Sequence, residues 1–205
     1  MVNLFKDLID VRASYSPVHV VKILFLLSEK PMGRFQLMKE MGMKEATIKT
    51  LVKRLKNNKL IESSTKGNLL TKKGNELLKK TLMKISKPIE IDISDYTVGK
   101  YNTAILVKNS SKKVKFGVEQ RDEAIKIGAD GATTLICSNG KLIFPGCNRN
   151  ITELEKILRR YFNIENEDVI VISSGSTKKI SEEASIMIAL SLIQKSIAFI
   201  SKIKF

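Results

Sequence analysis

The segment from residue 44 to residue 74 constrains the fold of this chain more than any other. An apolar stripe repeats there at positions i, i+3, i+4 and i+7, formed by Ile48, Leu51, Val52 and Leu55. This spacing predicts an amphipathic helix over residues 45–55. The opposite face is cationic and carries Lys49, Thr50, Lys53 and Arg54. We therefore expect a helix anchored by its apolar side, with its positive charge turned outward.

A short two-stranded ribbon is expected directly after this helix. Residues 60–64 and 69–71 flank the run Thr65-Lys66-Gly67-Asn68. Gly67 and Asn68 tolerate positive φ, so we place them with Lys66 at the tip of a tight hairpin. Thr71 then caps a helix from Lys72 to about Ile85, whose inward positions are Leu77, Leu78 and Leu82.

Two helices are predicted upstream of the cationic helix. Ser16-Pro17 is a typical helix start, and an apolar run continues to Leu27. A second helix is expected to begin at Gly33-Arg34. It should end at Gly42, because a glycine commonly terminates a helix in the left-handed conformation. Helix, short turn, helix, hairpin and helix in this order predict a winged helix-turn-helix.

Duplex DNA is the partner that this pattern favours, because a major groove admits one helix and Arg, Lys, Thr and Asn can contact bases or phosphates there. The candidate DNA-binding residues are Arg34, Lys44, Thr47, Lys49, Thr50, Lys53, Arg54, Lys66, Gly67 and Asn68. Residues 1–88 hold 19 Lys and Arg against 7 Asp and Glu, a net +12 of the chain's +15. The charge is thus concentrated where DNA contact is expected. The alternative is a plain helical domain with a solvated basic face.

Pro88 marks the expected domain boundary, since the pattern changes there from helical spacing to alternation. We predict two domains, residues 1–88 and residues 89–205. The second is expected to be of α+β class, with strands at 103–107, 112–118, 133–137, 141–144 and 168–172. Asn139-Gly140 predicts a hairpin. Helices are expected over 119–127, from Thr152 with a capping-box spacing to Glu155, and over 181–202.

Two places in the second domain have residues suited to binding. Arg121, Asp122, Asp130, Thr133 and Thr134 gather around a short helix and a glycine-rich turn, where Arg121 can meet the carboxylate or phosphate of a small-molecule effector. The alternative is a solvated helix with a structural ion pair. Residues 173–177 follow a strand and can hold an anion, but they lack a Walker A ending, which favours a capped loop.

Several classes of function have little support. The sequence has a single histidine, His19, which argues against a zinc site or a His-based catalytic triad. We expect Cys137 and Cys147 to be two reduced thiols. We expect no catalytic residues, metal or cofactor. The start of the chain is charged, which argues against a signal peptide and favours a cytoplasmic location. The final apolar helix, interrupted by Gln194 and Lys195, favours burial or a homodimer interface over a membrane anchor.

Three segments resemble the winged-helix transcriptional regulators of archaea and bacteria: Gly33-Arg34, the helix from Glu45 to Leu55, and the run Leu70-Thr71-Lys72-Lys73-Gly74. Residues 117–125, with 128–134, resemble the C-terminal domain of unknown function of an archaeal group of such proteins. The resemblance implies a DNA-binding regulator whose second domain senses a ligand or dimerises. The alternatives are an enzyme with an appended regulatory winged helix and a winged-helix protein-interaction module.

Overall fold

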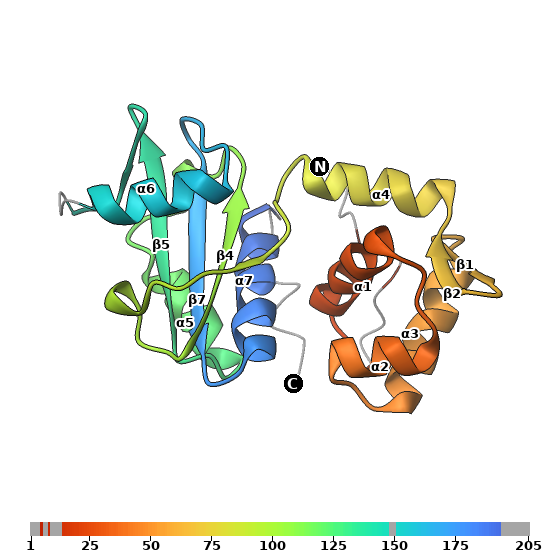
Figure 1. Cartoon of the computed structure of the whole chain (residues 1–205). Coiled ribbons are helices and arrows are strands. Elements are labelled where there is room, and N and C mark those ends of the chain that lie inside the picture. The colour runs from red at the N-terminus through yellow and green to blue at the C-terminus, as the bar shows by residue number, and fades with distance from the viewer. Residues whose placement is uncertain (1–4, 6–7, 9–13, 148–150, 194–205) are drawn as a thin grey trace. The chain divides into compact units, whose positions relative to one another are not determined.

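The computed structural model describes residues 5, 8, 14–147 and 151–193 (Figure 1). Two compact units divide the chain, one ending at Leu82 and the other beginning at Met83. Each is described by itself below. The chain as a whole is of α+β class, with helices preceding a mixed second unit.

The first unit has the element order helix, helix, helix, hairpin, helix. Its elements are α1 (Pro17–Glu29), α2 (Arg34–Met41), α3 (Glu45–Asn57), β1 (Ile61–Ser64), β2 (Gly67–Leu70) and α4 (Lys72–Leu82). Fully buried side chains from the first three helices form the core, among them Leu24, Leu37, Ile48, Leu51 and Leu55. The expected apolar stripe of residues 45–55 is therefore the buried face of α3.

Local chemistry explains where these helices begin and end. In α1, the Ser16 N–H donates to His19 Nδ1 at 2.9 Å, which satisfies a backbone donor that the helix itself cannot satisfy. Gly42 ends α2 in the left-handed conformation, at φ 56°. The Gly74 N–H donates to Thr71 Oγ1 at 3.1 Å, so Thr71 caps α4 as predicted.

Lys59 takes the left-handed conformation before the hairpin, with φ 58°. Two details of the first unit differ from the sequence predictions. Helix α4 ends at Leu82 rather than near Ile85, and Leu82 is exposed. Ile85 is instead buried and forms an isolated bridge with Val107, so the residues before Pro88 pack with the second unit.

A five-stranded antiparallel sheet forms the centre of the second unit (Figure 1). Its strands are β3 (Ile89–Glu90), β4 (Tyr101–Val107), β5 (Gly131–Ser138), β6 (Lys141–Ile143) and β7 (Val169–Gly175), in the spatial order β3-β4-β7-β5-β6. Strand β7 lies at the centre of this order, and Val169–Gly175 is accordingly buried throughout. Asn139 and Gly140, both at positive φ, make the predicted β5–β6 hairpin.

Helices cover both faces of this sheet. Helix α6 (Thr152–Tyr161) packs Leu154 and Leu158 against Leu135, Ile170 and Ile172 on one face. Helix α7 (Lys178–Ile193) lies on the other face, where Ser181 Oγ and Thr103 Oγ1 are 2.9 Å apart. Helix α5 (Val118–Lys126) packs against β5 and α7.

Several sequence predictions for this unit were wrong in detail. Residues 112–118 form no strand; a 3₁₀ turn, Ser111–Lys113, precedes α5. Ile151, not Thr152, is the residue before α6, so the capping box is absent. Helix α7 starts at Lys178, three residues earlier than expected, and its predicted continuation beyond Ile193 lies outside the described residues. Among the described residues, no helix is long and apolar enough to cross a membrane.

Candidate functional sites

The outer face of α3 exposes most of its predicted cations. Lys49, Thr50 and Lys53 are exposed on this face, and Lys44 is exposed immediately before the helix. The Thr50 hydroxyl donates to the Ala46 carbonyl at 2.9 Å, which leaves its lone pairs free to accept. Lysines at positions 49 and 53 are one helical turn apart, so they form a single cationic ridge.

Two residues predicted for this face are less available than the sequence suggested. Arg54 is only half-exposed, and its Nε is buried without a hydrogen-bond partner in the described chain. Thr47 is also half-buried, with its hydroxyl 3.2 Å from the Ser14 hydroxyl. The helical wheel places both residues at the margin of the exposed face, where packing decides their exposure.

Helices α2 and α3 are joined by an ion pair beside this face. Arg34 Nη2 lies 3.0 Å from Glu45 Oε1, and both side chains are about half-exposed. The guanidinium also lies 5.7 Å from the centre of the Phe35 ring, which is 72% exposed. Arg34 is thus held near the start of α3, and Glu45 is its partner rather than an unpaired acid.

The hairpin tip is formed by Thr65 and Lys66, because Ser64 pairs with Gly67 in the ladder of β1 and β2. Lys66 is exposed there, as predicted. The prediction that Gly67 and Asn68 also lie at the tip was wrong, since both belong to β2. Gly67 does take a positive φ, as predicted, but it is the first residue of β2 rather than a residue of the turn.

Gly67 and Asn68 serve to dock the hairpin on the chain before α2. Asn68 is buried; its backbone exchanges two hydrogen bonds with Met32, of 2.8 and 3.0 Å, and its Nδ2 donates to the Met32 carbonyl at 3.1 Å. A Cβ on Gly67 would lie 2.5 Å from the Met32 carbonyl carbon, and φ there is +118°. Only glycine fits this close approach. Asn68 therefore holds the hairpin against the chain before α2.

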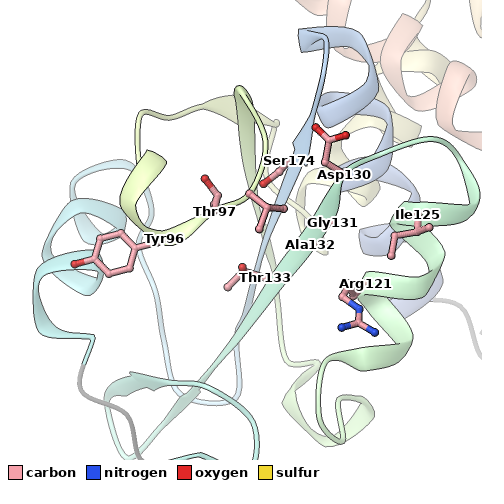
Figure 2. Close-up of a pocket in the computed structure, with 10 residues that line it drawn as sticks. Tyr96, Thr97, Arg121, Ile125, Asp130, Gly131, Ala132, Thr133 and Ser174 are labelled. Atoms are coloured by element: carbon pink, nitrogen blue, oxygen red, sulfur yellow. The ribbon is translucent and has the colours of Figure 1, made fainter.

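A cavity of about 330 Å³ lies in the second unit, at the start of β5 (Figure 2). It is lined by Tyr96, Thr97, Val98, Arg121, Ile125, Asp130, Gly131, Ala132, Thr133 and Ser174. Figure 2 shows Thr133 on β5 and Ser174 on β7, Thr97 on the loop before β4, and Arg121 and Ile125 projecting from α5. The cavity combines one cation (Arg121), one carboxylate (Asp130) and four hydroxyls with apolar side chains.

Three of the five predicted ligand residues meet at this cavity, namely Arg121, Asp130 and Thr133. Asp122 does not line it and instead lies 3.5 Å from the Arg121 guanidinium. Thr134 points to the opposite sheet face, because side chains alternate along a strand, and its Oγ1 is buried without a partner in the described residues. These two predicted residues therefore lie outside the lining of the cavity.

Sequence reasoning missed the lining residues that come from other segments. Ser174, on central strand β7, is 2% exposed, and its hydroxyl donates to Asn102 Oδ1 at 2.8 Å. A Cβ on Gly99 would lie 2.7 Å from an Asp130 carboxylate oxygen, so the segment before β4 packs closely on Asp130. No local pattern in the sequence marks these residues, because only strand pairing brings them to Asp130.

The anion loop considered for residues 173–177 is largely absent. Ser173, Ser174 and Gly175 belong to β7 and are buried. Of the remaining residues, Thr177 Oγ1 accepts from the Ile180 N–H at 3.2 Å and so caps α7. In the described residues no group of three or more His, Cys, Asp and Glu side chains could hold a metal ion, and Cys137 and Cys147 are free thiols.

The chain is similar to two protein-family models and to one solved structure, and none of their descriptions states an activity. Residues 98–192 match the model of a domain of unknown function (DUF4443). Residues 18–76 match the PH0730-like, N-terminal domain. A hypothetical protein, PH0730 from Pyrococcus horikoshii OT3, has a similar structure with a TM-score of 0.75 and 28% identity, covering 93% of this chain and 100% of that one. A comparison with curated proteins gives no match. The expected domain of unknown function is thus confirmed, and no activity comes with it.

Proposed function

We propose that this protein is a DNA-binding transcriptional regulator whose first unit acts as a winged helix-turn-helix. The observation that carries the proposal is the cationic ridge of Lys49 and Lys53 on an otherwise anchored helix α3. Helix α3 is fixed to the core by Ile48, Leu51 and Leu55, so the ridge is presented rigidly. A rigid helix with an exposed cationic face fits a DNA major groove.

The hairpin supports the same proposal. Lys66 stands exposed at its tip, and the main-chain bonds to Met32 fix the hairpin relative to the start of α2. In this arrangement α3 contacts bases and phosphates in the major groove, and Lys66 contacts the backbone or the adjacent minor groove. Lys44 and Arg34 are then the phosphate contacts at the start of α3.

The proposal is tested by fluorescence anisotropy with a labelled 30-base-pair duplex of mixed sequence, titrated at several salt concentrations. We expect Lys49→Ala plus Lys53→Ala to weaken binding and to lower the slope of log affinity against log salt by about one per lost phosphate contact. The matched control is Lys79→Ala plus Lys80→Ala, which removes two exposed lysines from α4. Equal effects of the two pairs would contradict the assignment of α3 to the groove.

The result also separates this proposal from a protein-interaction role. A winged helix that contacts only proteins has no salt-dependent affinity for DNA. If the native chain shows none at low salt, the first unit does not bind DNA, and protein partners become the better hypothesis.

A further inference from the structure

The cavity of the second unit is lined by opposite charges that are not paired with one another. Arg121 and Asp130 both line it, yet the structure shows no ion pair between these two described residues. The Arg121 guanidinium has one contact, at 3.5 Å from Asp122 Oδ1, and no hydrogen bond or ion pair from the described chain reaches the Asp130 carboxylate. Elsewhere in this unit neighbouring charges do pair, as Arg159 and Glu155 do at 2.8 Å. A ligand with charges of both signs would supply the two missing partners.

Close packing fixes the end of the cavity at Asp130. A Cβ on Gly99 would lie 2.7 Å from Asp130 Oδ2 and 2.8 Å from the Ser174 Cβ, so these two side chains are neighbours. The Asp130 N–H also donates to the Ser174 carbonyl at 2.8 Å. A Cβ on Gly131 would lie 3.3 Å from Val98 Cγ2, so the segment before β4 packs directly on the start of β5. The backbone that carries the carboxylate is therefore held in place by contacts within the unit itself.

Hydrogen-bond acceptors gather at this end of the cavity. The Ser174 hydroxyl donates to Asn102 Oδ1 at 2.8 Å, and the Thr97 hydroxyl donates to the Ile93 carbonyl at 3.2 Å. Because a hydroxyl has a single hydrogen, these two can only accept from a ligand. Together with the Asp130 carboxylate they form a site for a positively charged donor, and an ammonium group, which donates only, has this chemistry.

The other side of the cavity offers a donor. Figure 2 shows Arg121 projecting from α5, apart from Asp130 and Ser174. A guanidinium binds a carboxylate or a phosphate through two parallel N–H bonds. One cation and one carboxylate make the lining neutral, so a ligand of zero net charge leaves no charge uncompensated. A phosphate group would bring close to two negative charges against a single Arg, so a carboxylate is the better match.

We propose that this cavity binds a small zwitterion, with its ammonium group on Asp130 and Ser174 and its carboxylate on Arg121. The volume of about 330 Å³ equals that of about eleven water molecules at roughly 30 Å³ each, which sets the size at about ten non-hydrogen atoms. Val98 and Ile125 also line the cavity, so the stem that joins the two charges is apolar. An ω-amino acid or a dipeptide has these features. The site lies wholly in the second unit and does not depend on DNA binding by the first.

Isothermal titration calorimetry of the full chain, without DNA, tests the proposal. The ligands are the ω-amino acids from glycine to ω-aminohexanoate and the dipeptide glycylleucine, each compared with the acid and the amine of the same length that lack one of the two charges. We expect at least one zwitterion to bind, and affinity to rise as the stem lengthens from that of glycine. The acid and the amine should bind at least tenfold more weakly, because each leaves a charged group of the cavity unpaired.

Two variants of the chain assign the two ends of the ligand. Arg121→Gln should weaken the best zwitterion at least tenfold and leave it binding no better than the matching amine. Asp130→Asn should leave it binding no better than the matching acid. Both side chains are exposed, so the fold should persist, and circular dichroism checks this. The control Lys126→Gln removes an exposed cation of α5 that does not line the cavity, and it should leave the affinity unchanged.

Three results would overturn the proposal. One is the absence of binding by every zwitterion of the series at millimolar concentration. Another is equal binding of a zwitterion and its single-charge analogues, since the two charges would then not be recognised together. The third is an affinity that stays unchanged in either Arg121→Gln or Asp130→Asn. Because no DNA is present in these titrations, their outcome is independent of whether the first unit binds DNA.

Discussion

Replacing Gly74 by alanine tests how closely the hairpin base packs on α4. In an exposed helix this change normally stabilises a protein by about 1 kcal/mol, because glycine loses more backbone freedom on folding. Here a Cβ on residue 74 would lie 2.0 Å from the Leu60 carbonyl oxygen. The backbone fixes the position of the Cβ, and the Leu60 oxygen is itself a backbone atom, so no side-chain rotation can relieve the contact.

The two effects have opposite signs, and the clash should dominate. Forcing an extra methyl group into a packed site costs about 1–3 kcal/mol, and a 2.0 Å contact calls for the upper end of that range. After subtracting the propensity gain of about 1 kcal/mol, the net loss is about 2 kcal/mol. For a chain of this length that corresponds to a fall in Tm of roughly 4–8 °C.

The assay is urea unfolding followed by circular dichroism, with Glu76→Ala as the control. Glu76 is exposed in the same helix and should change the unfolding free energy by less than about 0.5 kcal/mol. The Leu60 carbonyl also accepts from the Thr71 N–H at 3.0 Å, so the Gly74 variant should weaken the cap of α4 as well. A Gly74→Ala protein as stable as the parent, or more stable, would refute the close packing.

Three further changes have expected outcomes. Asn68→Ala removes the buried bond to the Met32 carbonyl and should destabilise the chain by about 1–3 kcal/mol in urea unfolding. Lys108→Met leaves the buried Asp168 carboxylate without its 2.9 Å partner and should cost about 3 kcal/mol, while a double change with Asp168→Asn should recover part of the loss. Burial raises the pKa of Glu123 above its usual value near 4.5, so the folded chain holds this proton more tightly than the unfolded chain does. Stability therefore falls as the pH rises from about 4.5 through the raised pKa of the folded chain. Glu123→Gln should therefore raise Tm at pH 7 and should lose this advantage at pH below 4.5, where both states are protonated.

The first unit was predictable from sequence because its signals are local. A helical stripe at Ile48, Leu51 and Leu55 reports burial directly, and Thr71 and Gly42 mark helix ends through their own backbone chemistry. The errors arose where a long-range contact decided the outcome. Asn68 resembles a turn residue, but its pairing with Met32, 36 positions away, makes it a strand residue.

The cavity shows the same limit. Arg121, Asp130 and Thr133 are close in sequence, so their grouping was visible. Ser174 joins them only because β7 pairs with β5 in the register that sets Gly131 opposite Ser174. Thr134 was misplaced because the sequence did not state which sheet face its strand would turn toward the cavity, and a shift of one residue reverses the face.

The bond between Met32 and Asn68 has a consequence for the DNA that the proposed regulator selects. It ties the hairpin to the chain just before α2, and α2 is joined to α3 by the Arg34–Glu45 ion pair. Under the proposed function, the distance between the bases that α3 would read and the phosphates that Lys66 would contact is then fixed by the protein. Inserting one base pair within a half-site should therefore abolish one of the two contacts, whereas the sequence at the untouched positions between them should vary freely.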